Sequence, residues 1–318
     1  MPEPESILER VENGHELDRD EALRLASADC RRLSGTANRL RMQYDQNKFE
    51  LCSIVNAKSG LCSEDCKFCA QSSRHGAGVD TYGLIDPRRM AGLARTCAEK
   101  GVKRFSIVTS GRRPDDHEMK TICDAANRIR QETGLELCAS IGLARESDYK
   151  AMRDAGITRI HNNLETSRRH FGKICTTHAY DDKLRAIEKA QACGFEICSG
   201  GIIGMGETVE DRIDLAFEVR KIGAVSMPVN ILVPIQGTPL EDMEVLQENE
   251  ILKCVSLMKI INPKITVRMA GGRKLLGDKG RACFLAGSNA AITGDMLTTS
   301  GVAIDEDIRM LRGLAYEV

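Results

Sequence analysis

The sequence predicts an α/β protein, most simply a (β/α)8 barrel of the TIM type with an N-terminal helical extension. The 318 residues include 42% hydrophobic and 29% charged side chains, which is typical of a globular chain. Short β-type runs alternate eight times with helical patterns, and this alternation favours parallel strands joined by crossover helices. A doubly wound open sheet is the alternative, because sequence alone does not show whether the sheet closes.

The predicted strands are short apolar and β-branched runs, and the helices between them have amphipathic patterns. We predict strands over residues 50–55, 104–108, 135–141, 157–162, 195–203, 225–232, 265–269 and 290–293. We predict helices over residues 87–100, 115–133, 145–155, 181–193, 209–222, 247–261 and 305–314. Residues 1–45 are predicted to be helices that cap one end of the barrel, and residues 46–318 to form the barrel.

Capping residues support these helix boundaries. Asp86 precedes Pro87, which suits a helix N-cap followed by proline at the first helical position. Thr208 and Asp211 resemble a capping box. Several predicted helices also end at glycine, namely Gly101, Gly134, Gly156, Gly194 and Gly223.

Charge and cysteine content restrict the class of protein. The chain has 45 basic and 46 acidic residues, which argues against a nucleic-acid binder that relies on phosphate contacts. No apolar run approaches the roughly 20 residues that span a bilayer, and residues 1–12 do not resemble a secretory signal. We therefore expect a cytoplasmic protein that binds neither nucleic acid nor membrane. In that reducing compartment, clustered cysteines more often bind metal or do redox chemistry than form disulfides.

Three of the 13 cysteines lie in one loop after the first predicted strand, where barrel enzymes place their active sites. Cys62, Cys66 and Cys69 have the spacing C-x3-C-x2-C, which suits an iron–sulfur cluster or zinc. A structural zinc site needs a fourth ligand, usually from a second C-x2-C pair, and the sequence has none, although His75 is nearby. Three ligands on a four-iron cluster instead leave one iron open to a substrate or cofactor.

Three other residues do not suit the interior of a barrel, which is normally filled by Val, Ile and Leu. Cys138, Cys198 and Arg268 lie within predicted strands. A single strand cysteine is more often a small buried hydrophobic residue than a ligand. A buried arginine without a partner is costly, so Arg268 in particular indicates a function.

Taken together, several motifs resemble the radical S-adenosylmethionine (SAM) superfamily and, within it, the biotin synthases. The cysteine loop reads NAKSGLCSEDCKFCAQS over residues 56–72. Further along, the order and spacing of five segments carry the resemblance: IHNNLETS (160–167), ICSGGIIGMGET (197–208), PVNILVPIQGTPL (228–240), VRMAGGR (267–273) and CFLAGSNAAITGDMLTT (283–299).

The resemblance implies a sulfurtransferase that converts dethiobiotin to biotin. It implies a [4Fe-4S] cluster on Cys62, Cys66 and Cys69 that binds SAM and generates a 5′-deoxyadenosyl radical, chemistry that a cofactor must supply. It also implies an auxiliary cluster that donates sulfur, a flavodoxin- or ferredoxin-type electron donor and a homodimer. The alternatives are another radical SAM barrel enzyme such as a hydrogenase-cofactor maturase, and a non-catalytic zinc or electron-transfer protein.

The resemblance gives most of the auxiliary ligand set. Cys138, Cys198 and Arg268 match three ligand positions, but Ser106 occupies the position on the second strand where the family commonly has cysteine. Cys52, on the neighbouring first strand, occupies a position where other members can carry serine. Our hypothesis is that Cys52 replaces the missing thiolate. The auxiliary cluster is then either the usual [2Fe-2S] cluster or a larger four-iron one.

The same resemblance suggests the SAM and substrate contacts. Asn163 and Glu165 are two residues apart, so on a strand both would face one side, toward the substrate ureido group and the SAM ribose. Asn230 matches a second ureido contact, and an amide suits urea because it both donates and accepts. Lys183 matches a position where family members can carry an arginine for the SAM carboxylate. For three glycines we expect close backbone approach to SAM: Gly200, Gly201 and Gly204.

Overall fold

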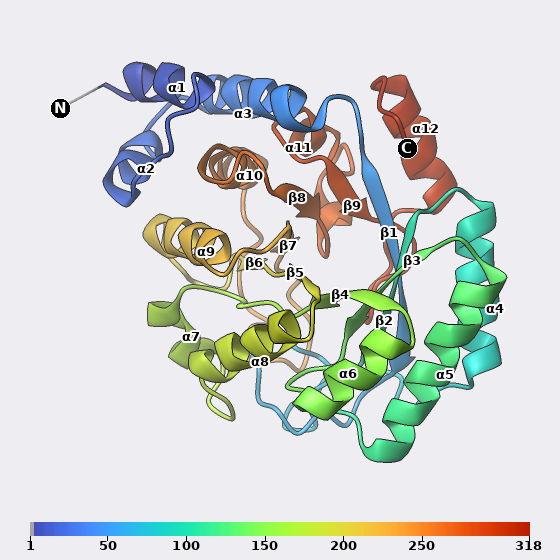
Figure 1. Cartoon of the computed structure of the whole chain (residues 1–318). Helices are drawn as coiled ribbons and strands as arrows, with labels where there is room; N and C mark the ends of the chain where they lie inside the picture. The colour runs from blue at the N-terminus through green and yellow to red at the C-terminus, as the bar shows by residue number, and fades with distance from the viewer. Residues whose placement is uncertain (1–2) are drawn as a thin grey trace.

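The computed structural model describes residues 3–318 and contains a closed barrel of parallel strands surrounded by helices (Figure 1). The strands hydrogen-bond in the order β5-β4-β3-β2-β1-β9-β8-β7-β6, and a pairing of β5 with β7 closes the barrel. Closure confirms the predicted (β/α)8 fold over the open sheet. The strands are β1 (Glu50–Lys58), β2 (Arg104–Thr109), β3 (Glu136–Ser140), β4 (Ile157–His161), β5 (Glu196–Cys198), β6 (Gly201–Ile203), β7 (Ser226–Ile231), β8 (Thr266–Met269) and β9 (Ala290–Ile292).

The fifth predicted strand is interrupted in its middle. Residues 195–203 form β5 and β6, which are separated by Ser199 and Gly200. A Cβ atom on Gly200 would lie 2.0 Å from the carbonyl oxygen of Pro228, and one on Gly201 would lie 2.2 Å from that of Glu165. The prediction of one continuous strand is therefore wrong at this point, where neighbouring backbones approach so closely that only glycine fits.

Helices form the outer layer, and each of the seven predicted over residues 87–314 is confirmed to within one residue at each end. Two short helices were not predicted, α7 (Arg168–Ile174) and α11 (Arg281–Leu285), because segments of five to seven residues give little periodicity. Within residues 3–318, no helix is long and apolar enough to cross a membrane. The predicted helices are α4 (Pro87–Glu99), α5 (Asp116–Glu132), α6 (Glu146–Asp154), α8 (Tyr180–Ala192), α9 (Val209–Lys221), α10 (Glu248–Ile261) and α12 (Ile304–Gly313).

The N-terminal extension forms α1 (Pro4–Glu12), α2 (Arg19–Leu25) and α3 (Cys30–Asp45), as predicted, while residues 1 and 2 lie outside the described part. We expected these helices to cap one end of the barrel. They instead pack against its side, on α9 and α10 (Figure 1). The buried ammonium of Lys259 in α10 lies 2.6 Å from the carboxylate of Asp45 and fixes α3 there. A domain boundary between residues 45 and 46 stays a prediction.

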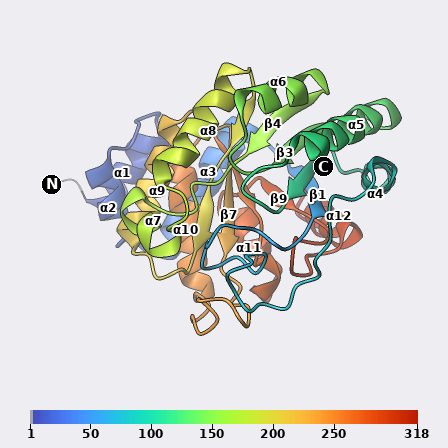
Figure 2. The same cartoon turned by 90° about the horizontal axis from the view of Figure 1, so that it is seen from below.

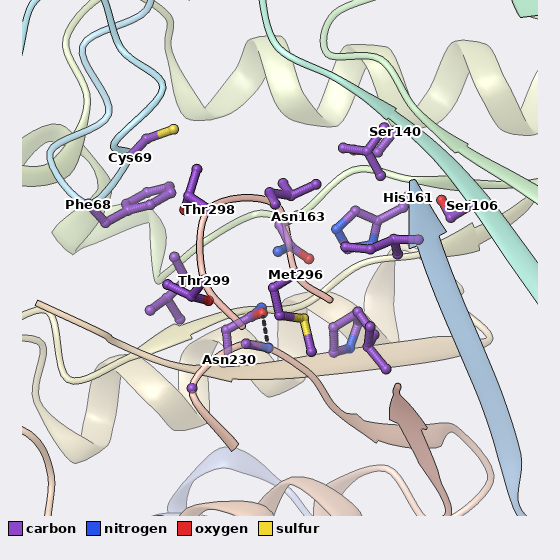
Figure 3. A pocket seen from close by; sticks show the side chains of 18 of the residues that line it. Phe68, Cys69, Ser106, Ser140, His161, Asn163, Asn230, Met296, Thr298 and Thr299 are labelled. Carbon is purple, nitrogen blue, oxygen red and sulfur yellow. Dashed lines mark hydrogen bonds between the residues drawn. The ribbon is translucent and has the colours of Figure 1, made fainter. Parts of the chain in front are cut away.

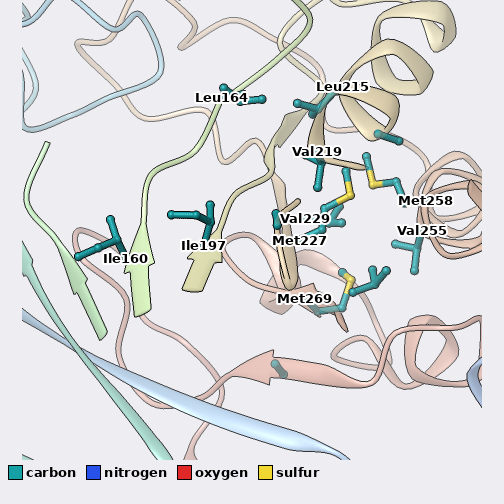
Figure 4. Close-up of a cluster of buried hydrophobic side chains, with 14 of the residues drawn as sticks. Ile160, Leu164, Ile197, Leu215, Val219, Met227, Val229, Val255, Met258 and Met269 are labelled. Atoms are coloured by element: carbon teal, nitrogen blue, oxygen red, sulfur yellow. The ribbon is translucent and has the colours of Figure 1, made fainter. Parts of the chain in front are cut away.

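The hydrophobic core lies between the outward faces of the strands and the helices. Figure 4 shows its part between the barrel and helices α9 and α10, where strand residues such as Met227 and Val229 meet Val219 and Val255. All four of these side chains are completely buried. Apolar packing is thus concentrated outside the barrel wall, which leaves the interior available for polar groups.

A layer of charged side chains occupies the interior near the start of the strands. Glu50 of β1 accepts hydrogen bonds from Arg104 of β2 at 3.1 Å, from Arg159 of β4 at 3.3 Å and from Arg268 of β8. Burial raises the pKa of Glu50, but the three guanidinium groups outweigh it and hold the pKa at about 2. Glu50 is therefore ionised and is the shared counter-charge of three buried arginines.

Two further carboxylates extend this charged layer. Glu136 pairs with Arg104, and Glu196 pairs with Arg159 at 2.8 Å. As a result, charges of opposite sign alternate across five adjacent strands, in the order Glu50, Arg104, Glu136, Arg159 and Glu196. Arg104 and Arg159 thus each pair with a carboxylate on a neighbouring strand, while Arg268 on β8 pairs with Glu50 two strands away, so all three buried charges have partners.

A buried carboxylate, Asp211, joins the two chain segments that follow β4 and β6. Its Oδ1 accepts from the hydroxyl of Ser167 at 2.5 Å and from Arg169 at 2.8 Å, and its Oδ2 accepts from the amide of Thr208 at 2.9 Å. Ser167 caps α7 and Thr208 caps α9, so one side chain sets the relative position of both helix starts.

We expect Glu50→Gln to lower the free energy of unfolding by about 2–4 kcal/mol, because loss of one partner from a buried ion pair leaves the other charges unpaired. Urea unfolding followed by circular dichroism measures the change. Glu136→Gln is the matched control, since the Glu136 side chain is 62% exposed and pairs with Arg104 alone. That control should cost less than about 1 kcal/mol. Equal losses in the two variants would contradict the central role of Glu50.

Asp211→Asn should destabilise the protein in a pH-dependent way. Burial raises the pKa of Asp211, but the bonds from Ser167, Thr208 and Arg169 outweigh it and lower the pKa below its usual range. A lowered pKa gives stability that is present above the unfolded pKa of about 4 and is lost as the pH falls through the folded value. We expect a loss of about 1–3 kcal/mol near pH 7 that shrinks near pH 3. Urea unfolding at both pH values tests this; an equal loss at both would contradict it.

Candidate active site in the barrel interior

The barrel encloses a cavity of about 330 Å³ toward the ends of its strands (Figure 3). A TIM barrel is normally packed with large aliphatic side chains. Here inward positions two residues apart on a strand carry smaller or polar groups, such as Cys52 on β1, Ser106 on β2, Cys138 and Ser140 on β3, and His161 on β4. The interior is therefore a chamber rather than a packed core.

Two loops lie at the mouth of this chamber. In Figure 2 the blue-to-cyan segment after β1 and the orange segment after β7 gather at one end of the barrel, and the amide of Gly76 donates to Gly237 at 3.0 Å between them. Within the first loop, the amide of Cys69 donates to Cys66 at 2.9 Å and that of Cys62 donates to Gln71 at 3.0 Å. These internal bonds shape the cysteine loop, and bonds to Gly237 and Ile174 hold it at the carboxyl ends of the strands, as predicted.

The loop cysteines fit a cluster better than a single ion. Within residues 3–318, one group of three Cys, His or carboxylate side chains has its ligand atoms all within 4.8 Å of one another, and that group is not the loop triad. Cys62, Cys66 and Cys69 thus stand too far apart for one metal ion, whereas the corners of a four-iron cluster need separated thiolates. Cys69 itself lines the chamber, next to Phe68.

All five candidate ligands of the auxiliary cluster line the same chamber. Ser106 pairs in register with Cys138 on the next strand, and Cys198 pairs with His161. Each candidate is buried, with less than a tenth of its surface exposed. The five side chains brought together are Cys52, Ser106, Cys138, Cys198 and Arg268.

The charges around these thiols differ. Burial raises the pKa of Cys52 and of Cys138. For Cys198, the hydrogen bond and charge of His161, together with Arg268, outweigh burial and lower the pKa to about 7. Among the three chamber thiols Cys52, Cys138 and Cys198, Cys198 is therefore the one most easily converted to the thiolate that binds iron.

Asn163 and Asn230 both reach the chamber, and both are fixed by backbone groups. Asn163 Oδ1 accepts from the amide of Gly200 at 3.1 Å. Asn230 donates to the carbonyl of Gly201 at 3.0 Å and accepts from the amide of Gly271 at 2.9 Å. An amide has two donors and two acceptor sites, so each side chain keeps capacity for a polar ligand.

Glu165 lines the chamber, but the prediction that it lies on a strand with Asn163 is wrong. Strand β4 ends at His161, and Glu165 has a left-handed backbone with φ of 69°, so it does not alternate with Asn163 along a strand. Its Oε2 is buried and has no hydrogen-bond partner within residues 3–318, while Lys183 Nζ lies 4.0 Å from Oε1. An unpartnered buried carboxylate oxygen suits a ligand that carries hydroxyl groups.

The glycines after β5 have a steric role. Gly200 and Gly201 allow close backbone contact, as described above, and Gly204 has φ of 97°. None of the three lines the chamber, although Ile202 between them does. Contact of Gly200, Gly201 and Gly204 with SAM stays a prediction, as does contact with Lys183.

Sequence reasoning missed the charged layer and His161. A signal was available, since a charged residue lies two positions before each inward polar residue on five strands. These pairs are Glu50 and Cys52, Arg104 and Ser106, Glu136 and Cys138, Arg159 and His161, and Glu196 and Cys198. Cys175 and His178, which lie against Cys66, were also missed as functional candidates.

Comparisons with known proteins agree with this geometry. The family model of the radical SAM superfamily matches residues 58–219, and that of the Biotin and Thiamin Synthesis associated domain matches residues 228–317. The biotin synthase of Brachyspira hyodysenteriae is 47% identical over 314 residues, which cover 99% of this chain and 94% of the relative. That of Heliobacterium modesticaldum is 50% identical over 309 residues, 96% and 95% of the two chains. The chain belongs to the biotin synthase family.

Membership confirms the resemblance found in the sequence and makes the chain a radical SAM sulfurtransferase. Two solved structures share its fold. The structure of methylornithine synthase matches with a TM-score of 0.84 at 19% identity, and the match covers 98% of this chain and 96% of that chain. The FeFe-hydrogenase maturase of Carboxydothermus hydrogenoformans has a TM-score of 0.83 at 14% identity, with coverage of 99% and 78%. At such identities the likeness shows the fold alone, and family membership favours sulfur insertion over the maturase alternative.

Proposed function

We propose that the chain converts dethiobiotin to biotin inside the barrel chamber. The observation that carries this proposal is that a single cavity is lined by Cys69 of the mouth loop and by the buried Cys138, Cys198 and Arg268. In Figure 3, Asn163 and Asn230 lie between Cys69 on one side and Ser106 on the other. A substrate held by the two amides would thus have one reactive centre on either side.

Residues at the mouth would bind SAM. Cys62, Cys66 and Cys69 would hold a [4Fe-4S] cluster, and the unpartnered oxygen of Glu165 would accept from the ribose hydroxyls. Lys183 would bring a positive charge toward the carboxylate of SAM. With both clusters, SAM and an electron donor bound, the cofactors supply a 5′-deoxyadenosyl radical at the mouth and sulfur at depth.

Residues in the middle would hold the substrate. Asn163 and Asn230 both donate and accept, which matches the neutral ureido group of dethiobiotin. Their bonds to Gly200, Gly201 and Gly271 fix both amides before substrate arrives. Fixed polar groups lower the ordering cost of binding and set which carbons face the mouth.

Residues at depth would hold the auxiliary cluster. Cys138 and Cys198 supply two thiolates, Arg268 a third ligand, and Cys52 the fourth in place of Ser106. Glu50 keeps the guanidinium of Arg268 in position. The cluster is either [2Fe-2S] or a larger four-iron cluster. We also propose a flavodoxin- or ferredoxin-type electron donor, a homodimer and a cytoplasmic location.

An anaerobic assay tests the function. Protein reconstituted with iron and sulfide, then given dithionite, SAM and dethiobiotin, should produce both 5′-deoxyadenosine and biotin. Production of 5′-deoxyadenosine without biotin would exclude sulfur insertion and keep radical chemistry. Absence of both products from a protein with its full iron content would overturn the whole proposal.

Cys52→Ala should remove iron and sulfide of the auxiliary cluster while leaving the loop cluster in place, because a buried thiolate at this position would be lost as a ligand. Ser106→Ala is the matched control and should retain both clusters, since it removes a hydroxyl from a neighbouring strand. Iron and sulfide per chain, with Mössbauer spectra of anaerobic protein, give the readout. The opposite result, loss in Ser106→Ala alone, would assign the fourth ligand to Ser106.

Asn163→Ala and Glu165→Gln should affect different ligands. Loss of a hydrogen bond of about 1.4 kcal/mol corresponds to about tenfold in affinity. We expect Asn163→Ala to raise the Kd for dethiobiotin about tenfold with little effect on the Kd for SAM, and Glu165→Gln to do the reverse. Isothermal titration with each ligand checks both variants. The assignments are wrong if each variant weakens both ligands equally.

A further inference from the structure

Beside the cysteine loop lies a group of side chains that the reaction chamber does not use. Cys175 directly follows α7, and its Sγ lies 3.8 Å from Sγ of Cys66, 3.3 Å from Nδ1 of His178 and 3.2 Å from Oδ1 of Asp65. Cys175 is 4% exposed and His178 is 8% exposed. None of Cys66, Cys175 and His178 lines the chamber.

The spacing of these atoms matches a tetrahedral metal site. Zinc binds thiolate sulfur at about 2.3 Å and imidazole nitrogen at about 2.0 Å, so tetrahedral geometry separates two sulfurs by about 3.8 Å and a sulfur from a nitrogen or oxygen by about 3.5 Å. The observed separations from Cys175 Sγ are 3.8 Å, 3.3 Å and 3.2 Å. Cys66, Cys175 and His178 also form the one group of such ligands that residues 3–318 bring within 4.8 Å.

Carboxylates complete the group on two sides. Glu64 Oε2 lies 2.5 Å from Nδ1 of His178, and Asp65 lies next to Cys175. Asp65 can supply the fourth ligand. The ion takes either ring nitrogen of His178: Nδ1 in exchange for its hydrogen bond to Glu64, or Nε2, which lies 3.8 Å from Cys175 Sγ, with Glu64 still orienting the ring through Nδ1. Two thiolates, an imidazole and a carboxylate are ligands that zinc and iron(II) accept.

Backbone contacts hold this group together independently of any metal. Asp65 Oδ1 accepts from the amides of Thr176 at 2.8 Å and Thr177 at 3.1 Å, and the amide of Lys67 donates to Ile174 at 3.0 Å. The segment that carries Cys175 and His178 is therefore fixed against the cysteine loop. A pre-formed site binds metal without the cost of ordering its ligands.

We propose that Cys66, Cys175 and His178, with the carboxylate of Asp65, bind one divalent ion, zinc or iron(II), in protein that lacks the loop cluster. The two thiols release their protons when the ion binds. Because Cys66 belongs to both sites, the single ion and the loop cluster exclude each other. A bound zinc ion therefore blocks cluster assembly, whereas a bound iron(II) ion places the first iron next to the loop. This proposal is independent of sulfur insertion.

Cobalt(II) is a suitable probe, because its visible bands report tetrahedral geometry and its thiolate charge-transfer band increases with the number of bound thiolates. Reduced, cluster-free, full-length protein should bind one tightly held cobalt(II) ion with two thiolates. Cys175→Ser, His178→Gln and Cys66→Ser should each weaken binding by at least about tenfold, because loss of a ligand costs no less than loss of a group that orients one. Circular dichroism and thermal unfolding of each variant establish that it is folded.

Cys62→Ser is the matched control, because Cys62 belongs to the loop but not to this group. It should keep the affinity and the charge-transfer band of the unmodified protein. If Cys175→Ser binds cobalt as the unmodified protein does while Cys62→Ser does not, the ion is held by the loop triad and the proposal is overturned.

Competition with cluster assembly gives a second, independent readout. Protein preloaded with one zinc ion should form its loop cluster several-fold more slowly than metal-free protein, as followed by the visible absorbance of the cluster. Cys175→Ser should abolish this delay while still forming the cluster. Preloading with iron(II) in place of zinc should give no delay, which distinguishes the two ions. A zinc delay that persists in Cys175→Ser would overturn the shared role of Cys66.

Discussion

The polar barrel depends on the carboxylate of Glu50, which pairs with Arg104, Arg159 and Arg268. A buried guanidinium without a partner is too costly for a stable fold. One acidic side chain on β1 makes three of them tolerable, because the barrel brings the starts of β2, β4 and β8 around it. Closure of the barrel and the charged layer therefore require each other, since in an open sheet of the same strand order β4 and β8 would lie three and two strands away from β1, out of reach of Glu50.

This layer also explains why the interior can be hollow. Stability comes from apolar packing between the strands and the outer helices, as in the cluster around Met227 and Val229 (Figure 4). The inward positions therefore need not carry the large aliphatic side chains that fill the interior of an ordinary TIM barrel. Charged groups close the chamber near the strand starts, and the loops after β1 and β7 lie at its mouth. A substrate inside would be shielded from water, which a radical reaction needs.

Local patterns in the sequence predicted the strands, the helices and the cysteine loop, because each depends on neighbouring residues. The break at Gly200 could not be predicted, since it results from the backbone of Pro228, which is distant in sequence. The backbone of Glu165 was mispredicted for a related reason: strand β4 ends early, at His161. Cys175 gave no signal in the sequence, because its partner Cys66 is 109 positions away. Contacts between residues that are far apart in the sequence can be predicted only where they leave a repeated pattern, such as the charged residue two positions before each inward polar residue.

The charged layer determines which charged side chain lies closest to each buried thiol, and this affects the pKa of the thiol. A thiol at position 106 would lie two residues after Arg104, whereas the thiol of Cys52 lies two residues after Glu50. Burial and Glu50 both raise the pKa of Cys52, and Arg268 is the cation that opposes them. A thiolate at Cys52 would therefore depend on the positive charge of Arg268 beside it. The proposed set of Cys52, Cys138, Cys198 and Arg268 would take one ligand from each of β1, β3, β5 and β8, whereas a ligand at Ser106 would lie on β2, directly beside β3.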